Sequence, residues 1–441
     1  MFLTVLMACG GGQGIDGAET DWIYNLEVQA AEDAPTVLEV TFDAPADVVA
    51  WIEYGLSSPD ESTTALSSAA GNHSIPVIGG GAYTEVMMRV VVESDGEQFK
   101  SGVFSATTEG LMPGTPTFEV TVDNYDPPQD AVLLMGVYND PSYLVMLNFD
   151  GEVVWSRSTG TSQEGYGLGV LPVDGEIHYN FFEKGINDGA YGTMSLTGEK
   201  LSIEDTPGGH HFFSISPDGA PVWIKDDVRS IGNEEVVGDQ IMVGLGEDAR
   251  SIFSTWDHFT FEPNPGTAPE WTHANWVEYH PDRDSYLIST AYTDTLVEMD
   301  TEGNPLRIFG GRRAAAGDSD YVFDDPGSLF SRPHGINWTS KGDLLVFSTI
   351  QNVSSVIRYE INDDTGVMIE RWRFGEEYGY EAMALGEVHE LSDGNILIGW
   401  GSVGLIQVVD PTTNTVLWEA QSALEQFPTQ LHYLDNPYIT K

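Results

Sequence analysis

The sequence predicts an all-β protein in which a six-bladed β-propeller follows an N-terminal β-sandwich. Three observations predict this fold. Short apolar runs alternate with turns along the 441-residue chain, which contains 48 glycines and 23 prolines. The N-terminal part has the strand spacing of a sandwich of fibronectin type III character. From about residue 131 a turn-and-strand unit repeats to the C-terminus, which is typical of a propeller.

The first nine residues form an apolar segment that ends at Cys9, the only cysteine of the chain. Residues 6–9, LMAC, resemble the lipobox of bacterial lipoproteins, in which the cysteine becomes the lipidated N-terminus. The resemblance implies that residues 1–9 are the remnant of a lipoprotein signal. It also implies that Cys9 anchors the protein to the bacterial outer membrane, in a periplasmic or surface-exposed position. No Lys or Arg precedes the segment, so we expect the true start codon to lie upstream.

Two segments separate this signal from the propeller. Residues 10–20, GGGQGIDGAET, have the composition of a flexible tether. Residues 21–120 contain alternating strands such as TVLEVTF and TEVMMRVVVES, and they form the expected sandwich. This region holds one histidine, His73, and no recognisable site, so we expect a spacer or docking domain. Prolines in LMPGTPTFEV and DNYDPPQD mark its end.

Residues 125–441 are expected to form the propeller. Glycine turns followed by apolar strands recur there, as in NFDGEVVW, SPDGAPVWI, TSKGDLLVF and LSDGNILIGW. Asp-Gly and Lys-Gly turns between β-rich runs favour antiparallel hairpins. A common blade of about 40–50 residues gives six or seven blades over this span. We expect six, because the inserts are long.

The net charge excludes one class of partner. The chain has 18 basic and 69 acidic residues, a formal net charge of −51. Nucleic-acid binding requires clustered Lys and Arg, and the first basic residue here is Arg89. The acidic residues are dispersed, which indicates a solvated surface suited to salty surroundings. A partner that brings its own cations is the alternative.

Four histidines recur at a similar place in the repeat. His211, His273, His334 and His389 each lie before or near a blade turn, and they are separated by 62, 61 and 55 residues. Residues at matching positions of successive inner strands point to one central funnel of a propeller. The spacing therefore predicts that these histidines meet. Asn275 shares a face with His273, since residues i and i+2 of a strand point the same way.

Such a cluster allows three kinds of chemistry. Imidazoles can hydrogen-bond an oxyanion, coordinate a metal, or supply a nucleophile and a general acid or base. No GxSxG, Walker, HExxH or EF-hand motif is present. We therefore predict no metal and no cofactor, with a histidine-ligated metal enzyme as a minor alternative. The other histidines of the region are expected to be structural or exposed: His178, His210, His258, His280 and His432.

At these histidines the chain resembles the bacterial arylsulfate sulfotransferases, six-bladed propellers that move a sulfuryl group between phenols without a nucleotide donor. The resemblance lies in GGHHFFSISPDG, WTHANWVEYHPDRDSYLIST, RPHGINWTSKGDLLVFSTI and VHELSDGNILIGWG, between about residues 205 and 402. It implies that His334 is a nucleophile that carries a sulfo-histidine intermediate. It also implies that His211 lines the pocket and that His273 with Asn275 binds sulfuryl oxygens or transfers protons.

One residue departs from the family pattern. The family has an arginine after the His-Ala-Asn strand that neutralises the sulfuryl oxygens, and Ala291 occupies that place here. Losing such a charge costs several kcal/mol unless another cation replaces it. Arg332 is the nearest candidate in sequence, and we expect Arg332 and His389 to contact substrate. The other candidate cations are Arg312, Arg313 and Arg358.

The sequence thus predicts a sulfotransferase that moves a sulfuryl group from an aryl sulfate to a phenolic acceptor. The alternative is a non-catalytic propeller lipoprotein that binds a ligand or partner in its funnel. The expected partners are small aryl sulfates and phenols, without nucleic acid, and the membrane is contacted only through the anchor at Cys9. The oligomeric state stays open.

Overall fold

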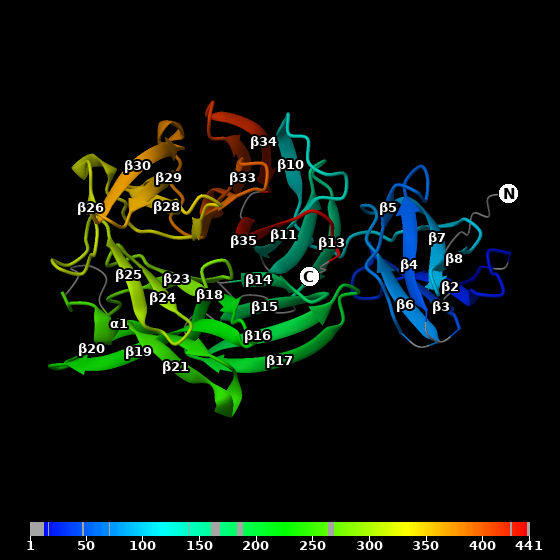
Figure 1. Cartoon of the computed structure of the whole chain (residues 1–441), viewed down its shortest axis with the longest axis horizontal. Helices are drawn as coiled ribbons and strands as arrows, with labels where there is room; N and C mark the ends of the chain where they lie inside the picture. The colour runs from blue at the N-terminus through cyan, green and yellow to red at the C-terminus, as the bar shows by residue number, and fades with distance from the viewer. Residues whose placement is uncertain are drawn as a thin grey trace.

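The computed structural model describes residues 13–15, 17–45, 48–69, 71–139, 141–159, 168–182, 188–262, 269–423 and 426–438. Cys9 and residues 10–12 and 16 of the expected tether lie outside these residues. The described part of that segment is not a free tether, because Gln13 and Gly14 pair with the strand at Tyr24–Ala30 and Ile15 and Ala18 are buried. The described part of the chain is all-β, with eight sheets whose strands pair almost entirely antiparallel. Two sheets from the N-terminal part lie at one end of the molecule, and the other six lie beside them (Figure 1). None of the helices among the described residues is long and apolar enough to cross a membrane.

The two N-terminal sheets have the orders β1-β2-β3-β6 and β5-β4-β7-β8, with β9 also paired to β7. Buried and half-buried residues alternate along β3 and along most of β4, which shows that each sheet has one face in a core. The strand bounds are β1 (Gln13–Gly14), β2 (Tyr24–Ala30), β3 (Leu38–Asp43), β4 (Val49–Gly55), β5 (Ser62–Thr63), β6 (Asn72–Val77), β7 (Glu85–Ser94), β8 (Glu97–Lys100) and β9 (Phe104–Thr107).

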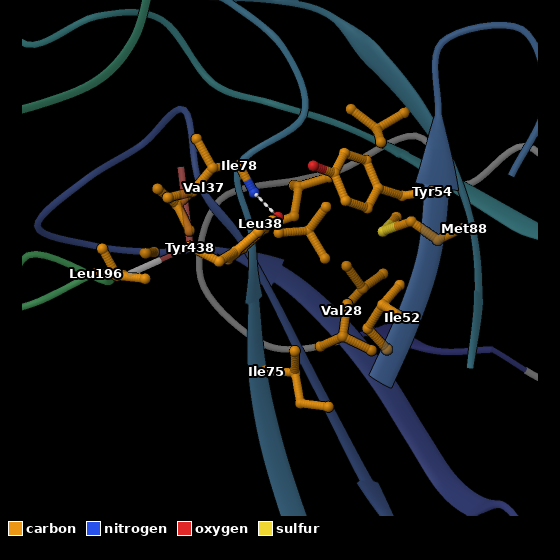
Figure 2. Packing of buried hydrophobic residues seen from close by; sticks show 14 of the residues in the cluster. Val28, Val37, Leu38, Ile52, Tyr54, Ile75, Ile78, Met88, Leu196 and Tyr438 are labelled. Carbon is orange, nitrogen blue, oxygen red and sulfur yellow. Dashed lines mark hydrogen bonds between the residues drawn. The ribbon is translucent and has the colours of Figure 1, made fainter. Parts of the chain in front are cut away.

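The core of this part includes a residue from the far end of the chain. Figure 2 shows Tyr438 among Val37, Ile78 and Tyr54, with its hydroxyl accepting the Ile78 N–H at 2.8 Å. Its ring meets that of Tyr54 edge to face at 6.0 Å. Leu196 packs into the same cluster. The N-terminal sheets are therefore joined to the rest of the chain by apolar contacts, and not by a linker alone.

The remaining strands form six sheets of four or five strands in the described residues. Four of these sheets are built from consecutive strands. In the other two, β10 joins β31–β34 and β35 joins β11–β13. The bounds are β10 (Phe118–Asp123), β11 (Val132–Tyr138), β12 (Tyr143–Asn148), β13 (Val153–Ser158), β14 (Leu168–Val173), β15 (Glu176–Phe182), β16 (Asp188–Ser195), β17 (Lys200–Pro207), β18 (Gly209–Ile215), β19 (Pro221–Ile231), β20 (Glu234–Val243), β21 (Arg250–Ser254), β22 (Ala274–His280), β23 (Ser285–Thr290), β24 (Thr295–Asp300), β25 (Pro305–Gly310), β26 (Val322–Phe323), β27 (Ile336–Trp338), β28 (Leu344–Ile350), β29 (Val353–Asn362), β30 (Val367–Phe374), β31 (Gly386–Glu390), β32 (Ile396–Trp400), β33 (Leu405–Asp410), β34 (Thr415–Ser422) and β35 (Phe427–Leu434).

The six sheets close into a ring. One edge strand of each sheet contacts the equivalent strand of the next, in the order β35, β14, β18, β22, β27, β31 and back to β35. Strands from the first and the last part of residues 118–434 pair with each other to close the ring. β35 pairs with β11, so that Val132 faces Leu434, and β10 pairs with β34, so that Phe118 faces Ser422. Two of the predicted site histidines, His211 and His389, lie in the edge strands β18 and β31, and the other two, His273 and His334, lie just before β22 and β27.

The predicted glycine turns are present, and tryptophans pack between the sheets. Gly151 and Gly394 have φ of 86°, as tight turns between strands require, and each turn is closed by a backbone hydrogen bond. Trp155, Trp276 and Trp418 are fully buried in the clusters between sheets, so they are core residues. The short helices are α1 (Thr255–His258), η1 (Gly246–Asp248), η2 (Pro326–Ser328), η3 (Glu376–Tyr378) and η4 (Gly401–Val403).

Candidate functional site

A pocket of about 370 Å³ opens where the edge strands of the ring begin. Five of the sequence-predicted residues line it together, although they come from three different sheets and their preceding loops. They are His211, His273, Asn275, Arg332 and His334. The prediction that histidines distant in the sequence meet in one place is therefore correct for these residues.

His211 reaches the pocket because β18 is irregular at that point. The residue has φ of 57°, and the register with β19 shifts between His210 and Phe213. Such a bulge re-aims side chains relative to plain alternation. His210 does not line the pocket, as expected, but its Nδ1 lies 2.8 Å from Nδ1 of His211. Simple alternation would have placed the two rings on opposite faces.

His273 lies against His211 at the start of β22. The two rings meet edge to face with their centroids 4.8 Å apart. A φ of 53° turns the chain at His273, and its ring stacks on Tyr292 at 4.5 Å. The Glu270 carboxylate lies 2.8 Å from Nδ1 of His273 and fixes the orientation of the imidazole. The other ring nitrogen is thereby available to the pocket.

His334 precedes β27 and is held by backbone groups. Its N–H donates to the Phe347 carbonyl at 3.0 Å, and its Nε2 accepts the Leu385 N–H at 3.3 Å. Burial, together with the nearby charges of His273 and Arg332, lowers the pKa of His334 to about 3. The imidazole is therefore neutral near pH 7 and keeps a nucleophilic lone pair. The long bond from Leu385 is at the weak end of the hydrogen-bond range.

The same effect keeps His211 neutral. Burial is the main cause that lowers its pKa well below the usual 6.5, and the neighbouring His273, His210 and His334 lower it further. Burial also lowers the pKa of His210, but its contacts with Asp226 and Asp239 raise the pKa overall to about 9. The pocket thus holds two neutral imidazoles, His211 and His334, and the protonated form of His210 is favoured behind them.

Asn275 is fully buried and fixed on both sides. Its Nδ2 donates to the Pro333 carbonyl at 3.1 Å, and its Oδ1 accepts the Ser289 hydroxyl at 2.5 Å. The first bond ties β22 to the residue that precedes His334. Asn275 therefore holds the nucleophile candidate in place besides lining the pocket.

Arg332 is the cation that the sequence left uncertain. It has φ of 46°, and its N–H donates to the buried Asp294 carboxylate at 2.6 Å. Its side chain lines the pocket beside His334, and among the described residues its guanidinium has no ion pair. Ala291 also lines the pocket and is 4% exposed. A turn in the backbone thus brings a cation to the pocket that Ala291 also lines.

The other candidate cations do not line the pocket. Arg313 forms a salt bridge with Asp294 at 2.8 Å and donates to the Ala291 carbonyl, so it supports the wall from behind. Arg358 lies 3.6 Å from Asp343. Arg312 is exposed. Arg332 alone, of the four, is among the lining residues.

The apolar wall of the pocket was not foreseen from the sequence. Tyr138 and Phe427 stack with parallel rings 6.2 Å apart, and Met383 and Leu385 complete this side. Tyr138 and Phe427 come from β11 and β35, outside the four motifs that carry the family resemblance, and Met383 and Leu385 come from the loop before β31, which leads to His389. The available signal in the sequence was an aromatic residue at the end of one closing strand, Tyr138 in β11, and at the start of the other, Phe427 in β35.

The structure corrects the prediction that His389 contacts substrate. It does not line the pocket, although the sequence placed it among the substrate contacts. Leu385, four residues earlier, does line it, and four residues of strand span roughly 13 Å. The His389 imidazole instead contacts Glu387 at 2.9 Å and Asn337 at 2.8 Å, in the buried interior of the ring of sheets. Burial raises the pKa of Glu387 to about 7, although the contact with His389 lowers this pKa.

The remaining histidines are structural. His280 was expected to be exposed, which is wrong: it is the last residue of β22, is half-buried, and lies near His389. Burial lowers the pKa of His432 to about 3, with His389 adding to the effect. His178 contacts the Tyr191 hydroxyl, and burial lowers its pKa to about 4. His258 stacks on Phe253 at 4.8 Å.

These features define an all-β protein whose ring of sheets surrounds a pocket with three histidines, one asparagine and one arginine that forms no ion pair with any described residue. The sequence matches the family described as Arylsulfotransferase (ASST) over residues 119–436, and the chain belongs to this family. No curated protein matches the sequence significantly.

Several solved structures are similar in part. A protein of unknown function from Bacteroides caccae has 14% identity and a TM-score of 0.46, over 70% of this chain and 99% of that one. A putative 6-phosphogluconolactonase from Bacteroides fragilis has 10% identity and a TM-score of 0.40, over 88% and 98%. Virginiamycin B lyase from Staphylococcus aureus has 14% identity and a TM-score of 0.37, over 71% and 89%. Similarities at this level support no inference about activity.

Proposed function

We propose that the protein is a sulfotransferase that moves a sulfuryl group from an aryl sulfate to a phenolic acceptor through a sulfo-histidine intermediate. One observation carries the proposal: Arg332, without an ion pair among the described residues, lies in the same pocket as the neutral His334. A sulfate ester needs a cation for its oxygens, and sulfuryl transfer needs a nucleophile beside that cation. The pocket offers both, together with an apolar wall for the aromatic ring.

In the first half-reaction, a ring nitrogen of His334 attacks the sulfur of the donor. The nitrogen lone pair forms the N–S bond, and the electron pair of the S–O bond leaves with the phenolate. Arg332 and Asn275 stabilise the sulfuryl oxygens as their charge grows. His211 or His273 protonates the departing phenolate, because both rings lie in the pocket.

The second half-reaction reverses these roles. A phenolic acceptor occupies the place of the departed phenol, between the apolar residues Tyr138, Phe427 and Leu385. The same imidazole removes the hydroxyl proton, and the phenolate oxygen attacks sulfur. The S–N bond breaks, and its electron pair returns to His334. No nucleotide is needed, since the histidine itself stores the group between the two steps.

The proposal extends to the architecture and to the location of the protein. The closed ring of six sheets supports a six-bladed propeller, and the two N-terminal sheets support a fibronectin type III-like sandwich in front of it. We further propose that Cys9, outside the described residues, anchors the protein in the bacterial outer membrane. Labelling with a radioactive fatty acid, with Cys9→Ser as the control, tests that anchor.

The activity is tested with 4-nitrophenyl sulfate as donor and phenol as acceptor. The wild type is expected to release 4-nitrophenol only when enzyme is present, and His334→Ala is expected to lose this release by at least about 10³-fold. His258→Ala, at an exposed histidine outside the pocket, is the control and keeps full activity.

The covalent step has its own measurement. After brief exposure to donor without acceptor, mass spectrometry of the digested protein should find one sulfuryl group on the peptide that contains His334. The group should disappear when phenol is added. A wild-type protein that turns over no aryl sulfate donor would leave only the non-catalytic binding function, against which the position of Arg332 already weighs.

A further inference from the structure

A second polar cluster lies directly behind the pocket and has no role in the sulfuryl transfer. Asp226 of β19 and Asp239 of β20 are cross-strand partners, and His210 of β18 packs across both. The Asp239 side chain is 4% exposed, and that of Asp226 is 20% exposed. Like charges directly opposite each other on neighbouring strands are destabilising. A buried pair of carboxylates therefore needs a positive charge between them, which is supplied either by a protonated His210 or by a metal ion that displaces the proton from its Nε2.

The distances within this cluster fit a metal ion better than they fit hydrogen bonds. His210 Nε2 lies 3.3 Å from Asp226 Oδ1 and 3.3 Å from Asp239 Oδ1, and the three ligand atoms lie within 4.8 Å of one another. Nevertheless this nitrogen is buried and makes no hydrogen bond. Ligand atoms about 2.1–2.3 Å from one ion, at angles near 90–110°, are separated by roughly 3.0–3.8 Å.

The surroundings hold each ligand in a suitable state. His210 Nδ1 faces His211 Nδ1 at 2.8 Å, so a proton on that nitrogen of His210 leaves Nε2 with a lone pair. Asp239 Oδ2 accepts the Ala274 N–H at 2.8 Å and the Thr272 hydroxyl, which leaves Oδ1 for the ion. Hydrogen bonds of this kind to the remote atoms of ligands accompany metal sites in general.

We propose that His210 Nε2, Asp226 Oδ1 and Asp239 Oδ1 bind a divalent transition-metal ion of the Mn²⁺ or Zn²⁺ class, with water at the remaining positions. One imidazole and two carboxylates suit such an ion. The partial exposure of Asp226 provides the route of entry. The site differs from the metal centre of three histidines that the sequence left as a minor alternative, and it does not depend on sulfuryl transfer.

Metal binding here would act on the pocket through one hydrogen bond. With its Nδ1 protonated, His210 donates to His211 Nδ1, and His211 then carries its own proton on Nε2. An ion on Nε2 of His210 excludes a proton there, so this tautomer of His211 is fixed without any contact between the ion and the substrate. His210 is in this sense a positioning residue for His211.

The test is isothermal titration of the metal-stripped full chain with MnCl₂ and, separately, ZnCl₂. A background of 0.3 M KCl suppresses loose binding to the acidic surface. One ion per chain is expected for the wild type. His210→Gln and Asp226→Asn should each weaken binding by at least about 10-fold. Asp257→Asn, at a carboxylate that is 64% exposed and paired with Arg229, should bind like the wild type.

Two outcomes would overturn the proposal: wild-type binding no tighter than that of His210→Gln, or binding of the same strength in all four proteins. Circular dichroism confirms that each variant is folded before titration. For bound Mn²⁺, hyperfine coupling to one nitrogen should be present in the wild type and absent in His210→Gln. The titration is repeated with His334→Ala, which keeps the metal site, so a failure of the proposed sulfotransferase activity leaves this result unaffected.

Discussion

At the scale of single residues, the position of Arg332 depends on its backbone. A non-glycine residue with φ of 46° is unfavourable, and it persists where neighbours hold it. Asp294 supplies this hold, because its buried carboxylate accepts the N–H of Arg332, the Ser331 hydroxyl and the Arg313 guanidinium. Asp294 therefore aims one arginine into the pocket and uses another as its counter-ion.

The role of Arg332 leads to a prediction about activity. Arg332→Ala should lower kcat/KM for an aryl sulfate donor by about 10²–10³-fold, because a charged donor to the sulfuryl oxygens is lost. Arg332→Lys should recover part of this, since lysine keeps the charge but lacks the planar fork. Steady-state kinetics measure both variants. Arg312→Ala, at a neighbouring exposed arginine, serves as the control, and an equal loss there would contradict the assignment.

The buried His334 predicts a pH-dependent stability difference. Its pKa is about 3 in the folded chain and near 6.5 when unfolded, so the unfolded state binds the extra proton between these values. The folded wild type should therefore lose stability relative to His334→Gln by about 1.4 kcal/mol per pH unit as the pH falls below 6.5. Urea unfolding of both proteins at pH 7, 6, 5 and 4 measures this. A difference that does not change with pH would show that His334 is not buried as a neutral ring.

At the scale of the elements, the repeated turns allowed the strands and the ring to be predicted, because glycine turns and apolar runs are local signals. Four of the site residues could be placed for the same reason, since His211, His273, Asn275 and His334 follow the repeat. Whether Arg332 would face the pocket was not decided by local signals. Its inward position depends on Asp294, which is distant in sequence.

Two errors at this scale arose because local patterns do not fix where a strand begins or which distant strand it pairs with. His389 was assigned to the pocket from its place relative to a turn, but position along an inner strand depends on where the strand begins. The apolar wall was missed because Tyr138 and Phe427 meet only when β35 pairs with β11. Contacts between strands from opposite ends of a chain leave no local pattern in a single sequence.

The closing strand β35 predicts a loss of stability on truncation of its core side chain. Leu431 is fully buried between sheets, so Leu431→Ala should cost about 2–5 kcal/mol in the free energy of unfolding. Leu201→Ala is the matched control, because Leu201 lies in β17 and is 46% exposed. It should change the same free energy by less than about 0.5 kcal/mol. Urea titration followed by tryptophan fluorescence compares them, and equal costs would contradict closure by β35.

At the scale of the whole molecule, the net charge of −51 acts on every part of the surface. The nine arginines and one lysine that form salt bridges among the described residues neutralise only a small share of the acidic groups. Self-repulsion of this size destabilises the compact state, and salt screens it.

The charge predicts that salt stabilises the protein. The Tm should rise steadily as KCl increases from 0.05 to 1 M, since the Debye length falls from more than 10 Å to about 3 Å. The same series at pH 4, where many carboxylates are protonated, should have a smaller slope. Differential scanning calorimetry gives both slopes. A Tm independent of salt at pH 7 would mean that the acidic groups are already compensated.

The closure of the ring also sets the order in which the chain can fold. The ribosome makes β11 well before its partner β35, because the two strands are separated by nearly three hundred residues of sequence. Until then β11 has one open edge, and unpaired edges invite association with other chains. Such distant pairings also slow folding. We therefore expect the nascent chain to need protection by chaperones until β35 is released.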